Sequence, residues 1–335
     1  MAGEPRLGRT GPRVSRVGLG LWQFGSPMWG GKALSADVLA RGLSIAVEEG
    51  INLLDTAEVY GMGSSERMLG EALKRLNARE DFVIVSKVAG FRSTAGDIVK
   101  GARGIAGRLS SAPDVILHHW PPPVYSRLCS VVRGLEQAVN EGLASYYGFS
   151  NYGEDLLGDA LSCTRRLEPV ADQILYNLAY RTPEQRLIPL LHQHGMTPIA
   201  WSPLAKGALA GFKGEPTRAQ AGDPVFRTAL EDTGLQEVLE SVARRLGASK
   251  ASVALAWVAY KGAVPIVGWR RPERVREAAA AARLKLSEED VALLDEASKR
   301  YVTLWGSSYS PPGLRRIRLI PGALQRLAIR LWGGI

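Results

Sequence analysis

Residues that could carry out acid–base chemistry stand at the ends of three short apolar runs. Asp55 closes the first run, Lys87 the second, and the pair His118 and His119 the third, while Tyr60 follows Asp55 in a polar, turn-like stretch. An ammonium held by a carboxylate can lower the pKa of a nearby phenol, and a histidine can hydrogen-bond a substrate oxygen. This combination predicts a site in which Lys87, held by Asp55, makes Tyr60 a proton donor.

A purely structural alternative exists for part of this set. A buried lysine at the end of a strand needs a counter-charge, and Asp55 on a neighbouring strand can provide it as a simple ion pair. That alternative gives no role to Tyr60 or to the histidines, whereas the acid–base interpretation uses them all.

The elements that would position these residues alternate along the chain. Short apolar runs predict strands at residues 17–21, 51–54, 82–86, 115–117, 146–149, 170–175, 197–201 and 264–267. Helical patterns occupy residues 35–49, 65–76, 97–109, 131–141, 154–164, 183–194, 235–246, 249–260, 271–282 and 287–298. This alternation favours an α/β fold, a single-domain (β/α)8 TIM barrel with its chemistry at the carboxyl ends of the strands. An open doubly wound sheet is the alternative, but the spacing of Gly18, Gly20 and Gly25 does not match G-x-G-x-x-G.

Composition narrows the possible partners. The 335 residues are 46% hydrophobic, and 42 Lys and Arg against 33 Asp and Glu give a net charge of +9. Basic runs are not interleaved with stacking aromatics, so we expect no nucleic-acid partner, and a pocket for a phosphorylated cofactor would use some of the charge. Cys129 and Cys163 lie in helical patterns, so we expect core or near-core thiols, neither a disulfide nor a metal site.

The two ends of the chain flank the expected barrel, which we place at residues 1–300. The amino terminus lacks an apolar signal segment, which favours a cytoplasmic location, and residues 6–15 predict a small hairpin.

Residues 301–335 form a tail in which Trp305 and Tyr309 could wrap over the barrel mouth. Leu314 to Trp332 alternates Arg with Leu and Ile, which indicates an amphipathic helix pair, broken at Pro321, that packs on the barrel or binds a membrane surface. Packing is the favoured interpretation, and we expect no stable membrane insertion.

Several separated motifs together resemble the aldo-keto reductase family over about the first 300 residues. They are GLGLWQFG from Gly18, DTAEVYG from Asp55, SE-x-x-LG from Ser65, SK at Ser86, HW at His119, GFSN from Gly148, Gln173, WSPL from Trp201 and PIVG from Pro265. The resemblance implies a (β/α)8 barrel that binds NADPH, with Tyr60 as proton donor and Asp55, Lys87 and His119 as its partners. His119 is chosen over His118 because the family's histidine lies five residues after the strand's aspartate and directly before a Trp-Pro pair.

The resemblance also implies a cofactor pocket. Ser150, Asn151 and Gln173 would hydrogen-bond the nicotinamide carboxamide, and Trp201 would stack on the ring, as in the branch near the potassium-channel beta subunits. The further contacts that it implies are Gly20 and Trp22 near the mouth, and Ser202, Pro203, Leu204 and Lys206 in a loop over the pyrophosphate.

The segment from Gly268 onward resembles the family's adenosine-phosphate site. Arg270 and Arg274 would bind a 2′-phosphate, which favours NADPH over NADH because guanidinium forks match phosphate geometry. Glu277 corresponds to a residue that contacts adenine. Ala278 departs from the family, which commonly has Asn there, so one hydrogen-bonding group for adenine is absent.

Two functions from different classes follow. The first is an NADPH-dependent oxidoreductase that reduces the carbonyl of a small aldehyde or ketone to an alcohol. The second is a nucleotide-sensing regulatory subunit that binds the cofactor and acts on a partner protein. Tyr60 favours the enzyme, since a pure binder needs no proton donor. The oligomeric state is open, with a monomer favoured, and the substrate cannot be read because loops at the barrel mouth set it.

Overall fold

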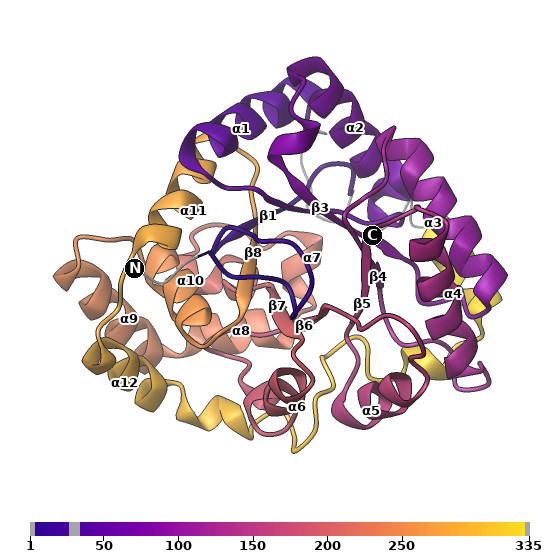
Figure 1. Cartoon of the computed structure of the whole chain (residues 1–335). Helices are drawn as coiled ribbons and strands as arrows, with labels where there is room; N and C mark the ends of the chain where they lie inside the picture. Colours follow the sequence, from indigo (N-terminus) through magenta and orange to yellow (C-terminus); the bar gives the residue numbers. More distant parts are fainter. Residues whose placement is uncertain (1–3, 27–33, 332–335) are drawn as a thin grey trace.

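Eight parallel strands close into a barrel in this computed structural model, which describes residues 4–26 and 34–331 (Figure 1). The strands are β1 (Gly18–Gly20), β2 (Leu53–Asp55), β3 (Val83–Val88), β4 (Val115–His118), β5 (Tyr146–Ser150), β6 (Ala171–Leu175), β7 (Thr197–Trp201) and β8 (Val264–Gly268). Each pairs with the next in the sequence, and β8 pairs with β1. The predicted (β/α)8 barrel is therefore confirmed, with every strand in place.

Helices surround the barrel and follow the predicted alternation. They are α1 (Ala36–Glu49), α2 (Ser64–Leu76), α3 (Ala95–Leu109), α4 (Leu128–Asn140), α5 (Glu154–Ser162), α6 (Leu187–Gln193), α7 (Arg218–Ala221), α8 (Pro224–Glu231), α9 (Thr233–Arg245), α10 (Lys250–Tyr260), α11 (Glu273–Arg283), α12 (Glu288–Ala297) and α13 (Gly322–Leu331). Short 3-10 turns occupy Tyr60–Gly63, Arg79–Asp81, Thr182–Glu184, Ala205–Ala210, Lys299–Val302 and Ile317–Leu319. The helix predicted over residues 183–194 is instead a 3-10 turn followed by α6.

Helices α7 and α8 were not predicted, although their starts carry local signals. The Thr217 side chain and Gln220 form a capping box at α7. Asp223 caps α8 by accepting hydrogen bonds from two backbone N–H groups, and Pro224 follows it. These are typical helix starts, and the short length of both helices hides their periodicity.

The N-terminal hairpin covers the end of the barrel where the strands begin. Arg6 and Arg13 form an antiparallel bridge, and Leu7 is fully buried among strand side chains. Gly8 donates a backbone hydrogen bond to Thr197 at the start of β7. Figure 1 views this end, with the hairpin in indigo over the barrel. The predicted hairpin is present, and it leaves the carboxyl ends of the strands as the open end.

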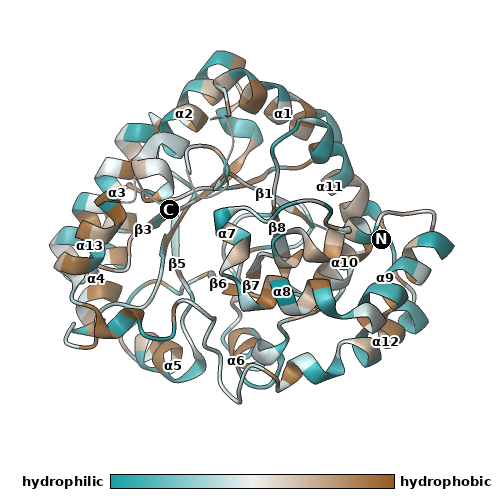
Figure 2. Ribbon diagram, turned by 180° about the vertical axis from the view of Figure 1, so that it is seen from behind, coloured by the Kyte–Doolittle hydropathy of each residue, from teal (hydrophilic) through white to brown (hydrophobic). Residues whose placement is uncertain are grey.

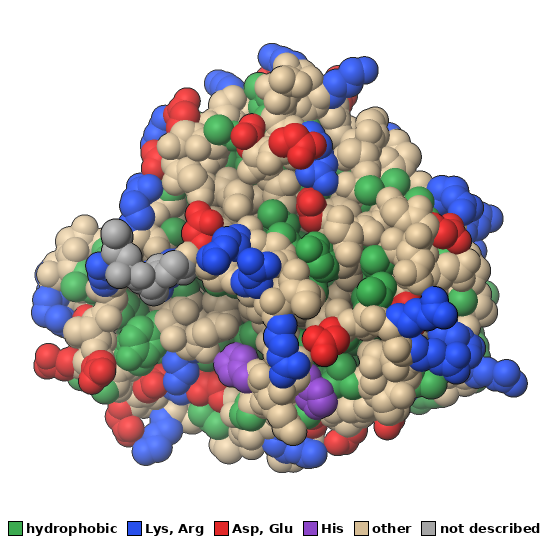
Figure 3. Space-filling view, viewed as in Figure 1, with side chains coloured by type: hydrophobic (Ala, Val, Ile, Leu, Met, Phe, Trp, Pro, Cys, Tyr) green, Lys and Arg blue, Asp and Glu red, His purple; other side chains and the backbone are tan. Residues whose placement is uncertain are grey.

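The outer surface mixes charges of both signs. On the face that carries the hairpin, basic and acidic side chains are interspersed (Figure 3). Helix α10 is buried along most of its length, and β8 follows it, as predicted for residues 249–260 and 264–267. None of the described helices is long and apolar enough to cross a membrane.

The tail lies against the β4–α4 side of the barrel. Arg318 O accepts a hydrogen bond from the Val124 backbone N–H at 2.9 Å, and Arg326 pairs with Asp97 at 3.2 Å. The predicted helix pair is only half correct, because the part before Pro321 is turns and a 3-10 segment, whereas α13 is helical. Trp332 lies outside the described residues, and the division at residue 300 stays a prediction.

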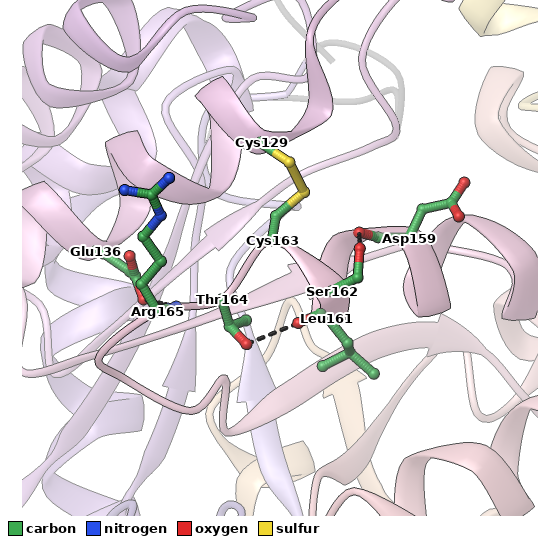
Figure 4. The surroundings of a disulfide bond; sticks show 8 residues. All are labelled: Cys129, Glu136, Asp159, Leu161, Ser162, Cys163, Thr164 and Arg165. Carbon is green, nitrogen blue, oxygen red and sulfur yellow. Dashed lines mark hydrogen bonds between the residues drawn. A yellow bond between two sulfur atoms is a disulfide. The ribbon is translucent and has the colours of Figure 1, made fainter.

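The expectation of free thiols is wrong, because Cys129 and Cys163 form a disulfide (Figure 4). Cys129 lies in the first turn of α4 and is exposed, whereas Cys163 directly follows α5 and is buried. The two helices are neighbours around the barrel, and the Cα atoms are 5.0 Å apart. The pairing depends on barrel topology, which the spacing of two cysteines does not show. Since disulfides persist mostly in oxidising compartments, the cytoplasmic location stays a prediction.

Breaking this disulfide should destabilise the barrel. The bond closes a loop of sequence separation 34, so restoring that freedom to the unfolded chain should cost about 3 to 4 kcal/mol of unfolding free energy. Urea denaturation of the oxidised protein, the dithiothreitol-reduced protein and the Cys129→Ser/Cys163→Ser variant measures the loss. Titration of thiols under denaturing conditions is the control for oxidation. Equal midpoints for all three samples would contradict the expectation.

Candidate active site

A buried lysine is the centre of the site. Lys87 is fully buried, and its Nζ donates to Asp55 at 2.7 Å, to the Thr56 carbonyl at 2.8 Å and to Tyr60 Oη at 3.4 Å. Asp55 pairs in register with Val85. Lys87 lies two residues further along β3 and therefore points to the same side, into the barrel. All three ammonium protons thus have an acceptor.

Tyr60 reaches Lys87 from a tight turn after β2. The backbone of Gly61 and Met62 is left-handed, with φ of 54° and 55°. A Cβ on Gly61 would lie 2.1 Å from the Gly25 carbonyl oxygen, so this turn requires glycine. The phenol ring then lies 5.6 Å from the His119 ring, centroid to centroid.

The predicted lowering of the Tyr60 pKa is wrong for this structure. Burial raises the pKa of Tyr60 well above its ordinary value, and the charge of Asp55 raises it further. Asp55 contacts the Lys87 ammonium directly and offsets its field at the phenol. Tyr60 is therefore a neutral, protonated phenol at physiological pH, which is the form that can give a proton.

The two histidines point in different directions. His118 hydrogen-bonds the Tyr152 hydroxyl at 2.8 Å and the Arg92 carbonyl at 3.0 Å, away from the cavity. His119 lines the cavity beside Tyr60, and its Nδ1 has no hydrogen-bond partner among the described residues. Burial lowers the pKa of His119 well below its ordinary value, and Lys87 lowers it further. Burial lowers the pKa of His118 to about 4. Both imidazoles are therefore neutral near pH 7.

Three polar side chains from the end of β5 and from β6, which we call the amide shelf, lie beside the Lys87 network. They are Ser150, Asn151 and Gln173. Gln173 Nε2 donates to Asp55 at 2.7 Å, which joins the shelf to the Lys87 network. Asn151 Nδ2 donates to Ser150 Oγ at 3.0 Å, and Asn151 Oδ1 accepts from Trp201 Nε1 at 2.9 Å. The shelf therefore has fixed orientations and presents amide and hydroxyl groups that a carboxamide could bind.

One cavity of about 570 Å³ gathers the predicted site residues. Those that line it are Gly20, Trp22, Asp55, Tyr60, His119, Ser150, Asn151, Gln173, Trp201, Ser202, Pro203, Leu204, Lys206, Gly268, Arg270, Arg274 and Glu277. Lys87 is the exception, because it lies behind Asp55 and Tyr60. It can act on a bound molecule only through those side chains.

Several lining residues were not predicted from the sequence. Trp120 directly follows His119 in the HW motif, and Arg271 directly follows Arg270, so both could have been inferred from their neighbours. Leu255 lies on α10, where an almost wholly apolar helix gives no sign of which residue meets the cavity. Leu314 enters from the tail, whose position no local pattern predicts.

Three arginines make part of the cavity wall basic. Arg270, Arg271 and Arg274 line it, and Arg274 donates to Glu277, with both side chains about half exposed. A phosphate could replace Glu277 as partner, since exposed ion pairs are weak. Lys206 pairs with Asp223 at 2.7 Å, so its predicted contact with a pyrophosphate would require this salt bridge to open.

The backbone of the loop after β7 is tightly turned. Ser202, Ala205 and Lys206 all have positive φ, between 46° and 54°. These left-handed residues turn the loop after β7 sharply where it borders the cavity. Together, the shelf, the loop and the arginines fit a long, phosphate-bearing ligand such as a dinucleotide.

Comparisons with known proteins agree with this arrangement. The profile of the Aldo/keto reductase family matches residues 16–299. An uncharacterized oxidoreductase of Mycobacterium tuberculosis is 32% identical over 301 residues, which cover 86% of this chain and 91% of that protein.

Solved structures share the fold. An aldo/keto reductase from Klebsiella pneumoniae, in complex with NADP and acetate, has a TM-score of 0.73 and 28% identity, covering 92% of this chain and 96% of that one. A thermostable aldo-keto reductase in complex with the inhibitor epalrestat has a TM-score of 0.74 and 31% identity, covering 88% and 99%. The chain is therefore an oxidoreductase that belongs to the aldo/keto reductase family.

Proposed function

We propose that this protein reduces aldehyde or ketone carbonyls to alcohols with NADPH, and that Tyr60 supplies the proton. The observation that carries the proposal is the buried Lys87, which holds both Asp55 and the Tyr60 hydroxyl while Tyr60 and His119 face one cavity. When bound, NADPH would supply the hydride that the carbonyl carbon accepts.

The side chains then have distinct tasks. Tyr60 Oη gives its proton to the carbonyl oxygen, and the phenolate that remains is stabilised by the Lys87 ammonium 3.4 Å away. Neutral His119 donates a hydrogen bond to the same oxygen and orients the carbonyl. Asp55 helps to keep the fully buried Lys87 charged.

The cofactor is assigned from the polar and basic residues that line the cavity. NADP is bound in the Klebsiella pneumoniae structure, and in this chain Ser150, Asn151 and Gln173 line the same cavity as Arg270 and Arg274. We assign the amide shelf to the nicotinamide and the arginines to the 2′-phosphate. Trp22 and Trp120 border the cavity near Tyr60 and favour an apolar group on the carbonyl substrate.

Removing the proposed proton donor tests the chemistry. Tyr60→Phe keeps the ring and its packing but removes the hydroxyl, so carbonyl reduction should fall by at least about a hundredfold. NADPH affinity should stay nearly unchanged, because the ring still fills its place. Absorbance of NADPH with a panel of aldehydes measures turnover, and fluorescence titration measures binding. Near-normal turnover by Tyr60→Phe would reject this mechanism and favour the nucleotide-sensing alternative.

The adjacent histidines provide a matched pair. His119→Gln should lower kcat/KM for the carbonyl by at least about tenfold, because it disturbs the donor to the substrate oxygen. His118→Gln should leave kcat/KM within a few-fold, since its partners lie outside the cavity. Steady-state kinetics of both variants, with thermal unfolding as the check on folding, decides the assignment. A larger loss for His118→Gln would reverse it.

The arginines predict cofactor selectivity. NADPH should bind at least about tenfold tighter than NADH, and Arg270→Ala/Arg274→Ala should reduce that ratio, because a charge-assisted phosphate contact is lost. Arg276→Ala is the control, since Arg276 lies on α11 with Arg274 but pairs with Glu48 and Glu49. Fluorescence titration with both nucleotides gives the ratios. Equal affinities in the unmodified protein would show that the arginines do not bind the 2′-phosphate.

A further inference from the structure

The tail helix α13 has two different faces. Gln325 is buried and accepts a hydrogen bond from Trp120 Nε1 at 2.8 Å, so this face packs on the barrel. Leu324, Leu327 and Leu331 are 54%, 51% and 74% exposed. With 3.6 residues per turn, these three leucines share one side of the helix, turned away from Gln325. An amphipathic helix thus exposes its apolar side.

The exposed leucines belong to a larger surface that we call the tail patch. It comprises Val124, Tyr125, Leu319, Ile320, Leu324, Leu327 and Leu331, all exposed. Backbone contacts hold its two parts together: Val124 N–H donates to Arg318 O, and Gly322 N–H donates to the Tyr125 hydroxyl. Figure 2 shows α13 beside α3 and α4 at the edge of the barrel. Monomeric soluble proteins seldom expose this many large apolar side chains in one patch unless the patch binds a partner.

The charge of the same segment has a single sign. Residues 301–335 contain no Asp or Glu and five arginines, so they contribute +5 of the chain's net +9. The arginines are Arg315, Arg316, Arg318, Arg326 and Arg330. The hairpin face, in contrast, mixes both signs (Figure 3). The tail patch therefore combines exposed leucines with a local excess of positive charge.

We propose that the tail patch docks this protein on the surface of an anionic lipid bilayer. The leucines would enter the boundary between headgroups and acyl chains, while arginines contact lipid phosphates. Long arginine stems can lie along apolar surface with their charge at the headgroups. Packing on the barrel and attachment to a membrane, which the sequence presents as alternatives, would use different faces of α13. Leu314 lines the cavity from the same tail, so docking brings the cavity near the bilayer.

Vesicle co-sedimentation of the full-length protein tests this surface. Phosphatidylcholine vesicles with about 30% phosphatidylserine should bind the protein at least about tenfold more tightly than vesicles of phosphatidylcholine alone. About 0.5 M NaCl should remove most of that difference, because salt screens the arginines. Equal binding to both vesicles, or binding to neither, would overturn the proposal.

Matched variants locate the surface. Leu324→Gln/Leu327→Gln removes part of the apolar face but keeps the Gln325 and Arg326 contacts, and Arg316→Gln/Arg330→Gln removes two exposed charges. Each should weaken binding to the anionic vesicles by about tenfold or more. Leu293→Gln on α12 is the control, since Leu293 is similarly exposed at 47%, and it should not change vesicle binding.

Two further measurements distinguish lipid docking from a role of the tail patch in catalysis or in self-association. NADPH-dependent turnover of a small soluble aldehyde should be unchanged in these variants, because none of the altered residues lines the cavity. The thermal midpoint should also be unchanged, because the altered side chains are exposed. The oligomeric state is measured by sedimentation at several protein concentrations. A dimer that Leu324→Gln/Leu327→Gln disrupts, without vesicle binding by the original protein, would assign the patch to a second copy of the chain and reject the lipid surface.

Discussion

The buried ammonium of Lys87 constrains the rest of the site. An isolated charge in a barrel interior is unfavourable by several kcal/mol unless its protons are satisfied. Here Asp55, the Thr56 carbonyl and Tyr60 satisfy all three. Each acceptor comes from β2 or the turn after it, so this turn must fold back over β3. Asp55 also accepts from Gln173 on β6, so a change in Asp55 would act on Lys87 and Gln173 together.

The sequence predicts the fold well because the strands and helices of the barrel each have a recognisable local sequence pattern. Each strand is a short apolar run, and each is separated from the next by a helical period, so the alternation specifies parallel pairing. The placement of Asp55, Lys87 and His119 follows from the same rule about strand ends. Local patterns say less where the outcome depends on distant neighbours. The disulfide between Cys129 and Cys163 needs α4 and α5 side by side, and the pKa of Tyr60 depends on burial and on the balance between Lys87 and Asp55.

The tail extends beyond the part of the chain that the family profile matches. The family profile ends at residue 299, yet side chains beyond it reach the polar groups of the cavity. Tyr309 donates from its hydroxyl to Asn151 Oδ1 at 3.0 Å and accepts from the Leu175 backbone N–H at 2.9 Å. Gln325 accepts from Trp120. The open end of the barrel is therefore completed by residues that lie beyond the family profile.

Substitutions in the Lys87 network and substitutions in the tail have different consequences. Residues on β2, β3 and β6 are tied to one another by the Lys87 charge, so a substitution there would leave a buried polar group without its partner. The tail meets the same cavity through Leu314 and through contacts to Trp120 and Asn151. The exposed leucines on the outer face of the tail, Leu324 and Leu327, take no part in those contacts and do not line the cavity. Shape at the cavity mouth and chemistry at the outer surface can therefore vary in the tail while the Lys87 network is kept.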